Sequence, residues 1–237
     1  MINYAHRGAS DYAPENTLSS FYLGLLQGAN GIETDVQITK DGVLVLFHDD
    51  TLDRVTDFSG AVSDYSYDQL RKAKVYGSSV SGFYDRIVKF ETFLEHFSQY
   101  DIRFAIELKS GGVEAKVIEA IRKYGITERT TVTSFKFEYL KRVKELDSSI
   151  RIGWLVDGDG CDHIPELLAI GGEEMAPRAR DMTAQSVQTL REAGLGVRAW
   201  GLANVDLMKK MCALGVDGMT VNFPDRLSVY LDKNRNI

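Results

Sequence analysis

Length, composition and charge exclude several classes of protein before any motif is considered. The chain has 237 residues, 44% of them hydrophobic and 26% charged, as in ordinary globular proteins and unlike disordered ones. Its formal net charge of −6 argues against nucleic acid as a partner, because non-specific binding to phosphates needs a surplus of Lys and Arg. No apolar run is as long as a membrane span, so we expect no stable membrane insertion and a cytoplasmic protein. Cys161 and Cys212 fit no metal or redox spacing and are predicted to be reduced structural thiols.

Before residue 100 the chain shows strand patterns and one clear helix. Apolar side chains recur at helical spacing over roughly residues 17–27, which predicts an amphipathic helix. Asn16 or Thr17 can cap its start, and Gly28 is placed to end it. Strands are expected over residues 2–6, 31–38 and 43–49, the last two joined by the turn Lys40-Asp41-Gly42.

The stretch from about residue 50 to residue 86 interrupts this order. It is polar and rich in Ser, Asp, Tyr and Gly, with one short helical piece around residues 67–74. A long irregular segment in a compact domain is usually a functional loop or a small inserted subdomain. We therefore predict one domain over residues 1–237, with an insertion at about 50–86 after the second strand.

After residue 100 strands and helices alternate regularly. Strands are expected over residues 102–108, 130–135, 151–156, 173–177, 196–202 and 217–222. Helical patterns lie between them, for example at 113–125, 138–147, 184–194 and 205–215. With the first two strands this gives eight β-then-α units, a number that favours a TIM (β/α)8 barrel. The alternative is an open doubly wound sheet, which is weakened because no G-x-G-x-x-G follows a strand.

Unusual polar residues fall at or near the ends of the early strands. They are His6 and Arg7 at the first strand, Glu33 and Asp35 in the second, His48 at the end of the hairpin, and Glu107 with Lys109 at the next strand. Strand residues two apart point the same way. A barrel gathers the carboxyl ends of its strands at one mouth, where barrel enzymes have their active sites. These seven residues are therefore predicted to converge on one rim.

The chemistry of this set favours an anionic substrate. Three carboxylates that meet repel one another unless they are protonated or a cation neutralises them, and all-oxygen ligands suit Mg²⁺ or Ca²⁺ better than Zn²⁺. The two histidines can act as general acid and general base. Arg7 can pair with phosphate through its planar fork, and Lys109 adds a point charge. Phosphodiester hydrolysis is the simplest chemistry that fits.

Each of these residues alone is more often structural than functional. A single strand carboxylate is usually solvated or paired, and His48 alone could be a structural histidine. The functional interpretation depends on their placement together at strand ends. By contrast, His96 and His163 lie on helical patterns away from strand ends, and we predict structural roles for both.

Several sequence blocks resemble the glycerophosphodiester phosphodiesterase family. HRGASDYAPENT is similar to its H-R-G…P-E-N-T opening, and GIETDVQITKDGVLVLFHDDTLDRVT to its E-x-D…D-G…H-D…L-x-R-T block. AIELK matches the third-strand E-x-K, and GLGVRAW and ALGVDGMTVNFPD resemble the closing strands. The resemblance extends over essentially the whole chain and implies a TIM barrel with a small insertion after the second strand.

The resemblance also implies an activity and a set of roles. Family members hydrolyse glycerophosphodiesters to sn-glycerol 3-phosphate and an alcohol, and the glycerol 2-hydroxyl acts as internal nucleophile. By matching motifs, the resemblance places one divalent cation, Mg²⁺ or Ca²⁺, on Glu33, Asp35 and Glu107. It gives acid–base catalysis to His6 and His48, phosphate contacts to Arg7 and Lys109, and a wall of the substrate pocket to Trp200.

The chain departs from the family pattern in the predicted pocket wall. GLAN follows Trp200 in place of T-V-N, RIVKFETFL lacks I-P-T-L, and Lys136 stands where an acidic residue is common. The resemblance therefore does not specify the alcohol group. Two alternatives stay open at this point: a phospholipase-like barrel acting on lysophospholipids or phosphoinositides, and a module that binds a phosphodiester without cleaving it.

Overall fold

Eight parallel strands close on themselves in the computed structural model, which describes residues 1–77 and 82–234. The barrel strands are β1 (Ile2–His6), β2 (Gly31–Ile38), β6 (Arg103–Leu108), β7 (Thr130–Ser134), β8 (Arg151–Val156), β9 (Glu174–Pro177), β10 (Gly196–Ala199) and β11 (Gly218–Val221). Each pairs with its neighbours in parallel, and β1 pairs with both β2 and β11. The predicted TIM barrel is confirmed, and the open doubly wound sheet is excluded.

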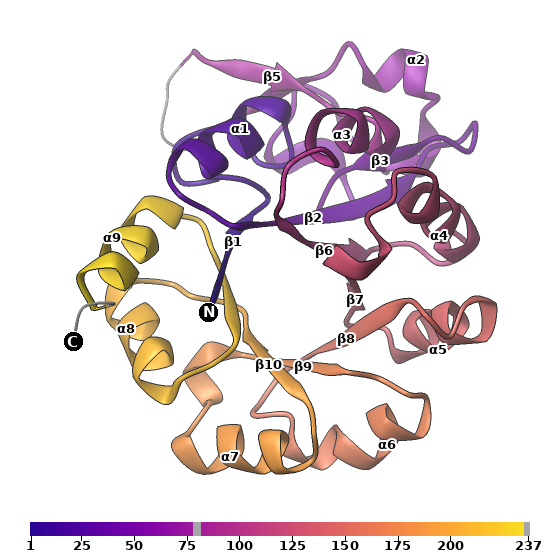
Figure 1. Cartoon of the computed structure of the whole chain (residues 1–237). Coiled ribbons are helices and arrows are strands. Elements are labelled where there is room, and N and C mark those ends of the chain that lie inside the picture. The colour runs from indigo at the N-terminus through magenta and orange to yellow at the C-terminus, as the bar shows by residue number, and fades with distance from the viewer. Residues whose placement is uncertain (78–81, 235–237) are drawn as a thin grey trace.

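Helices form a ring outside the strands (Figure 1). They are α1 (Leu18–Leu26), α3 (Phe90–Phe97), α4 (Glu114–Lys123), α5 (Phe137–Leu146), α6 (Ile164–Ala169), α7 (Ala184–Glu192), α8 (Val205–Leu214) and α9 (Pro224–Asn234). Short 3-10 helices are η3 (Thr127–Arg129), η4 (Cys161–His163) and η5 (Ala179–Asp181). Apolar helix faces cover the barrel, as where Phe93 of α3 packs edge-on against Phe104 of β6. Among the described residues, no helix is both long and apolar enough to cross a membrane.

The amino-terminal end of the barrel interior is filled by large polar side chains. The buried Arg198 donates from Nε to Oε1 of Glu174 at 2.8 Å and lies over the ring of Tyr4. Gly153 makes room for this pair, because a Cβ there would lie 2.7 Å from the Glu174 oxygen. The charges of the pair compensate each other, which is what a buried ion pair requires. This end of the barrel is therefore closed.

The sequence predicted which helices and strands form better than it predicted where each of them begins and ends. Helix α1 begins after Thr17, whose hydroxyl accepts from the amide of Ser20. The hairpin strand β3 (Leu44–Leu46) is shorter than the predicted 43–49 and pairs antiparallel with β2. Beyond it, the side-chain amide of Gln37 donates to the carbonyls of Phe47 and Asp49, at 3.0 and 2.7 Å. These bonds replace the strand ladder and fix the segment that carries the second predicted catalytic histidine.

The predicted insertion forms a small unit beside α1 and α3 (Figure 1). It contains η1 (Leu52–Arg54), η2 (Val62–Asp64), α2 (Tyr67–Leu70) and the antiparallel pair β4 (Lys74–Tyr76) and β5 (Tyr84–Arg86). Leu52, Val62 and Leu70 are fully buried in an apolar cluster that also includes Val45 of β3. Residues 78–81 of the predicted insertion and 235–237 of the predicted domain lie outside the described residues, and the single-domain assignment stays a prediction.

Candidate active site

The turn after β1 has a backbone conformation that few residues adopt. Arg7 has φ +56°, in the left-handed region, and Gly8 follows with φ +85°. A Cβ on Gly8 would lie 2.3 Å from Oγ of Ser20, so only glycine fits there. The amide of Arg7 donates to Oε2 of Glu33 at 3.1 Å. Strain at a non-glycine residue is typical of functional sites, and here it turns the Arg7 side chain toward the barrel mouth.

Three buried carboxylates meet at this mouth. Glu33 and Asp35 come from β2 and Glu107 from β6, and one oxygen of each lies within 4.8 Å of the others. Oδ1 of Asp35 is buried and has no hydrogen-bond partner among the described residues. A buried acceptor without a donor is costly. Three hard oxygen ligands around it fit a divalent cation such as Mg²⁺ or Ca²⁺.

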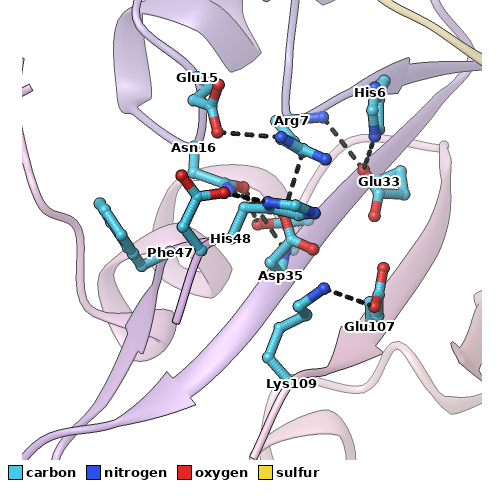
Figure 2. A network of polar contacts seen from close by, with 12 residues as sticks. His6, Arg7, Glu15, Asn16, Glu33, Asp35, Phe47, His48, Glu107 and Lys109 are labelled. Atoms are coloured by element: carbon cyan, nitrogen blue, oxygen red, sulfur yellow. Dashed lines mark hydrogen bonds and ion pairs between the residues drawn. The ribbon is translucent and has the colours of Figure 1, made fainter. Parts of the chain in front are cut away.

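Two basic side chains and one amide surround the carboxylates (Figure 2). Nε of Arg7 lies 3.3 Å from Oδ2 of Asp35. Asn16 donates to that same oxygen at 2.9 Å. On the other side, Nζ of Lys109 donates to Oε1 of Glu107 at 3.0 Å. Three carboxylates against two basic groups leave a net negative charge, which a divalent cation would reverse.

Burial and mutual repulsion separate the acidities of the three carboxylates. Burial, together with the charges of Asp35 and Glu107, raises the pKa of Glu33 well above its usual range. Burial and Asp35 also raise the pKa of Glu107 to about 7. Burial alone would raise the pKa of Asp35, but the charges of Arg7, His48 and Lys109 and the hydrogen bond from Asn16 together outweigh it, and the pKa is lowered. Asp35 is therefore the most persistent anion of the group.

His6 is held with one ring nitrogen facing the carboxylates. Its Nδ1 donates to Oδ1 of Asn222 at 2.6 Å, which leaves Nε2 3.9 Å from Oε2 of Glu33. Burial, and next the charge of Arg7, lower the pKa of His6 to about 4. The ring is therefore neutral near pH 7, with an unprotonated Nε2 that can accept a proton.

His48 is oriented by a carboxylate. Its Nδ1 donates to Oδ1 of the adjacent Asp49 at 2.6 Å. The hydrogen bond of one ring nitrogen fixes the tautomer and orientation of the imidazole. All seven polar residues predicted from strand ends are thus placed around one mouth, as Figure 2 shows.

Five further residues of this network were missed by the strand-end argument. They are Glu15, Asn16, Asp49, Arg54 and Asn222. Four of them lie on loops and Arg54 ends the short helix η1, so none lies on a strand whose period could reveal the direction of its side chain. The available signal was their position inside the blocks APENT, HDDTLDR and TVN, which carry the family resemblance.

A cavity of about 410 Å³ opens between the segment that follows β1 and the insertion. His6, Arg7 and Asn222 line it on the barrel side, and Arg54 and Tyr76 on the insertion side. The rest of its lining is mostly polar or charged: Ser10, Asp11, Glu15, Val55 and Gly77. The insertion therefore forms part of the space next to the catalytic groups.

Trp200 lies on the opposite side of the mouth, after β10. Its Nε1 donates across β9 to the carbonyl of Val156 at 3.0 Å. The ring of Phe135 meets it edge-on at 5.0 Å, and the guanidinium of Arg178 lies over its face at 5.1 Å. This position is compatible with the predicted pocket wall, and that role stays a prediction.

Neither helix histidine joins the network of Figure 2. Nδ1 of His96 lies 2.9 Å from the hydroxyl of Tyr22 on the outer layer. His163 packs on the ring of Trp154, with centroids 4.7 Å apart. Both contacts agree with the structural roles predicted for them.

Fold and site together define a TIM-barrel enzyme with a buried acidic trio and oriented histidines at the carboxyl ends of its strands. Comparison with known proteins identifies the family to which this enzyme belongs. The model of the glycerophosphoryl diester phosphodiesterase family matches residues 6–226. The chain belongs to this family, and the predicted enzyme class, a phosphoric diester hydrolase, is confirmed.

Relatives match over nearly their full lengths. A glycerophosphodiester phosphodiesterase from Caldanaerobacter subterraneus is 32% identical, over 94% of both chains. The structure of a glycerophosphodiester phosphodiesterase from Agrobacterium tumefaciens is 27% identical, with TM-score 0.85 over 97% of this chain and 99% of the other. A phosphodiesterase from Oleispira antarctica, in complex with the product sn-glycerol 3-phosphate, is 26% identical, with TM-score 0.85 over 98% and 97%.

Proposed function

We propose that this chain hydrolyses glycerophosphodiesters to sn-glycerol 3-phosphate and an alcohol, using one divalent cation and two histidines. The observation that carries the proposal is the buried trio of Glu33, Asp35 and Glu107, with an acceptor on Asp35 that lacks a donor. The product complex of the Oleispira relative supports the choice of substrate. A binding module without catalysis is disfavoured because every member of the predicted catalytic set is in place.

The cavity beside His6 favours a small, water-soluble alcohol. Its lining is mostly polar or charged, and Val55 and Tyr76 are its main apolar contributions. An acyl chain would gain about 0.8 kcal/mol for each buried CH₂ only against apolar walls. A lysophospholipid is therefore the weaker alternative.

The proposed reaction uses the glycerol 2-hydroxyl as nucleophile. Arg7 and Lys109 bind the phosphate. A cation held by Glu33, Asp35 and Glu107 would act as a Lewis acid toward the phosphate. Nε2 of His6 accepts the hydroxyl proton as the oxygen attacks phosphorus. The bond from phosphorus to the alcohol oxygen breaks, and His48 protonates that oxygen. Water then opens the cyclic phosphate.

The assignment of base and acid follows from the partners of the two rings. His6 has its Nδ1 proton fixed on Asn222 and a pKa lowered to about 4, so its free nitrogen is a base at neutral pH. His48 is oriented by its bond to the carboxylate of Asp49, and we assign it the complementary role of acid. Sequence alone left this assignment open.

A substrate series with and without the glycerol 2-hydroxyl tests the mechanism. Glycerophosphocholine should be hydrolysed in Mg²⁺ or Ca²⁺ and should not be hydrolysed after metal is stripped with EDTA. The 2-deoxy analogue should bind as a competitive inhibitor and turn over barely, because an internal nucleophile contributes roughly 7–11 kcal/mol. Loss of a single hydrogen bond would cost only about 0.5–1.5 kcal/mol. Equal kcat for both diesters would show that water attacks directly.

A further inference from the structure

We infer that Arg54, contributed by the insertion, is a positioning residue that joins His48 to Arg7. The inference rests on the proposed function, because it concerns how that same site is assembled. Arg54 lies on η1, outside the barrel, and its side chain is about half exposed. Its guanidinium binds two carboxylates at the barrel mouth, Asp49 beside His48 and Glu15 beside Arg7.

The first arm runs to His48 through Asp49. Nη2 of Arg54 donates to Oδ1 of Asp49 at 3.0 Å, and Nε donates to Oδ2. Oδ1 is also the acceptor of the His48 ring. Burial works to raise the pKa of Asp49, but the bonds from Arg54 and His48 outweigh it and lower the pKa to about 2. Asp49 is therefore ionised and fixed in the one position from which it orients the ring.

The second arm runs to Arg7 through Glu15. Nη1 and Nη2 of Arg54 donate to the two oxygens of Glu15, at 2.9 and 2.7 Å. Oε1 also accepts from Nη1 of Arg7 at 3.0 Å. Arg7 in turn lies 3.3 Å from Asp35. A continuous chain of contacts thus links the ring of His48 to the cation site by way of the insertion.

A guanidinium is needed for this bridge. Its planar fork binds one carboxylate through Nε and Nη2 and the other through Nη1 and Nη2, which a lysine ammonium cannot reproduce. Without that group, two carboxylates would face each other without a shared cation, and repulsion would move them apart. The side chain has firm support, because the neighbouring Leu52 is fully buried in the apolar cluster of the insertion.

The contacts through Asp49 and those through Glu15 should affect different kinetic constants of the full-length enzyme, measured on glycerophosphocholine in Mg²⁺. Loss of a residue that orients a functional group typically costs about 10- to 100-fold. Asp49→Asn should lower kcat by that factor with little change in KM, because it affects the proton donor. Glu15→Gln should chiefly raise KM, because it affects the phosphate-binding arginine. Arg54→Met should do both.

Two comparisons distinguish positioning from a general loss of structure. Arg71→Met is the matched control, because Arg71 belongs to the same insertion and forms a surface ion pair with the exposed Asp68 at 3.0 Å. It should leave kcat and KM within about twofold, the scale of an exposed pair. Arg54→Lys should recover little of the activity that Arg54→Met loses. Added methylguanidinium should restore part of the activity of Arg54→Ala, because the site is half exposed.

Binding of sn-glycerol 3-phosphate, measured by calorimetry in Mg²⁺, gives a readout that does not depend on turnover. Affinity should fall about 10-fold or more in Arg54→Met and be unchanged in Arg71→Met. Equal kcat, KM and affinity in these two variants would overturn the inference. If the wild-type enzyme cleaved no glycerophosphodiester but its affinity still depended on Arg54, the proposed function would fail and the bridge would stand.

Discussion

The two sides of the barrel mouth are built from different chemistry. The metal side, formed by β1, β2 and β6 with the loop after β3, carries seven ionisable residues: His6, Arg7, Glu33, Asp35, His48, Glu107 and Lys109. The aromatic side, after β7 to β10, carries Phe135 and Trp200, with Arg178 over the indole and paired with Asp157 at 3.2 Å. The metal side has an acceptor without a donor, whereas the indole nitrogen of Trp200 is satisfied.

This difference shows that the eight units of the barrel are equivalent in fold and unequal in function. Buried carboxylates are costly unless they are neutralised, so the metal side needs Arg7, Asn16 and Lys109 around them. Five of its seven residues lie between positions 6 and 48, just before the insertion. The aromatic side completes the barrel and shapes the mouth. Changes to the histidines and carboxylates of the metal side should therefore lower kcat, and changes on the aromatic side should affect KM and leave kcat nearly unchanged.

The largest expected effect is removal of either catalytic histidine. His6→Ala and His48→Ala should each lower kcat by about 10²–10⁴-fold, the usual contribution of a general acid or base. The control variants His96→Ala and His163→Ala should change kcat little, because these rings contact Tyr22 and Trp154 away from the mouth. Steady-state assays of all four variants check this. An equal loss in the control pair would mean that the site is misplaced.

A change of leaving group separates the roles of the two histidines. Glycerophospho-p-nitrophenol keeps the 2-hydroxyl, but its leaving group departs without protonation. With this substrate His48→Ala should recover most of its lost kcat, and His6→Ala should recover none, because the hydroxyl proton must still be removed. Recovery of kcat in His6→Ala and not in His48→Ala would show that His6 is the acid and His48 the base.

The next effect concerns the cation and its dependence on pH. The pKa of Glu107 is about 7, above its ordinary value of 4.5. Glu107 of the folded, metal-free protein therefore holds a proton between these values that it lacks in the unfolded chain, and its contribution to the free energy of unfolding falls as pH rises through this window. His6, with a pKa lowered to about 4, contributes in the opposite direction between pH 4 and its ordinary value of 6.5. A cation competes with that proton. Mg²⁺ at 100 times its Kd adds about 2.7 kcal/mol, or roughly 5–10 °C in Tm, and the increment should be larger at pH 8 than at pH 5.5.

Carboxylate variants test whether the acidic trio is the source of that increment. Glu33→Gln, Asp35→Asn and Glu107→Gln should each reduce the rise in Tm with Mg²⁺. Glu91→Gln is the control, because Glu91 pairs with Lys123 on the outer surface. The rise in Tm with Mg²⁺ is measured by thermal unfolding at both pH values. An increment that is the same at pH 5.5 and pH 8, or that persists in all three variants, would place the cation elsewhere.

The smallest effect is expected on the aromatic side. Trp200→Phe removes the hydrogen bond to Val156 and should raise KM by about 2- to 10-fold, the equivalent of one neutral hydrogen bond. The value of kcat should stay within about twofold. Trp154→Phe is the control, since Trp154 packs outward on Phe137 and His163, and it should change Tm and not KM. A large loss of kcat in Trp200→Phe would contradict the division between the two sides.

Sequence predicted the barrel and its charged residues for a common reason. Strand side chains alternate with a period of two, and parallel strands bring their carboxyl ends to one mouth. Glu33, Asp35 and Glu107 were therefore predictable from their positions in apolar runs. Strand ends were less predictable: β3 stops at Leu46, and the side chain of Gln37 binds the carbonyls of Phe47 and Asp49 beyond it.

What the sequence by itself determined was the fold class and the identity of the groups that face the mouth, since both depend on local periodicity and on motifs. Only the tertiary structure decided how those groups are oriented. His6 is fixed by Asn222, which lies 216 positions away in the chain. Arg54 bridges Asp49 and Glu15 from an insertion that shares no periodicity with the barrel. Such partners meet through the packing of loops, and a hydrogen bond needs a distance and an angle that no spacing along the chain specifies.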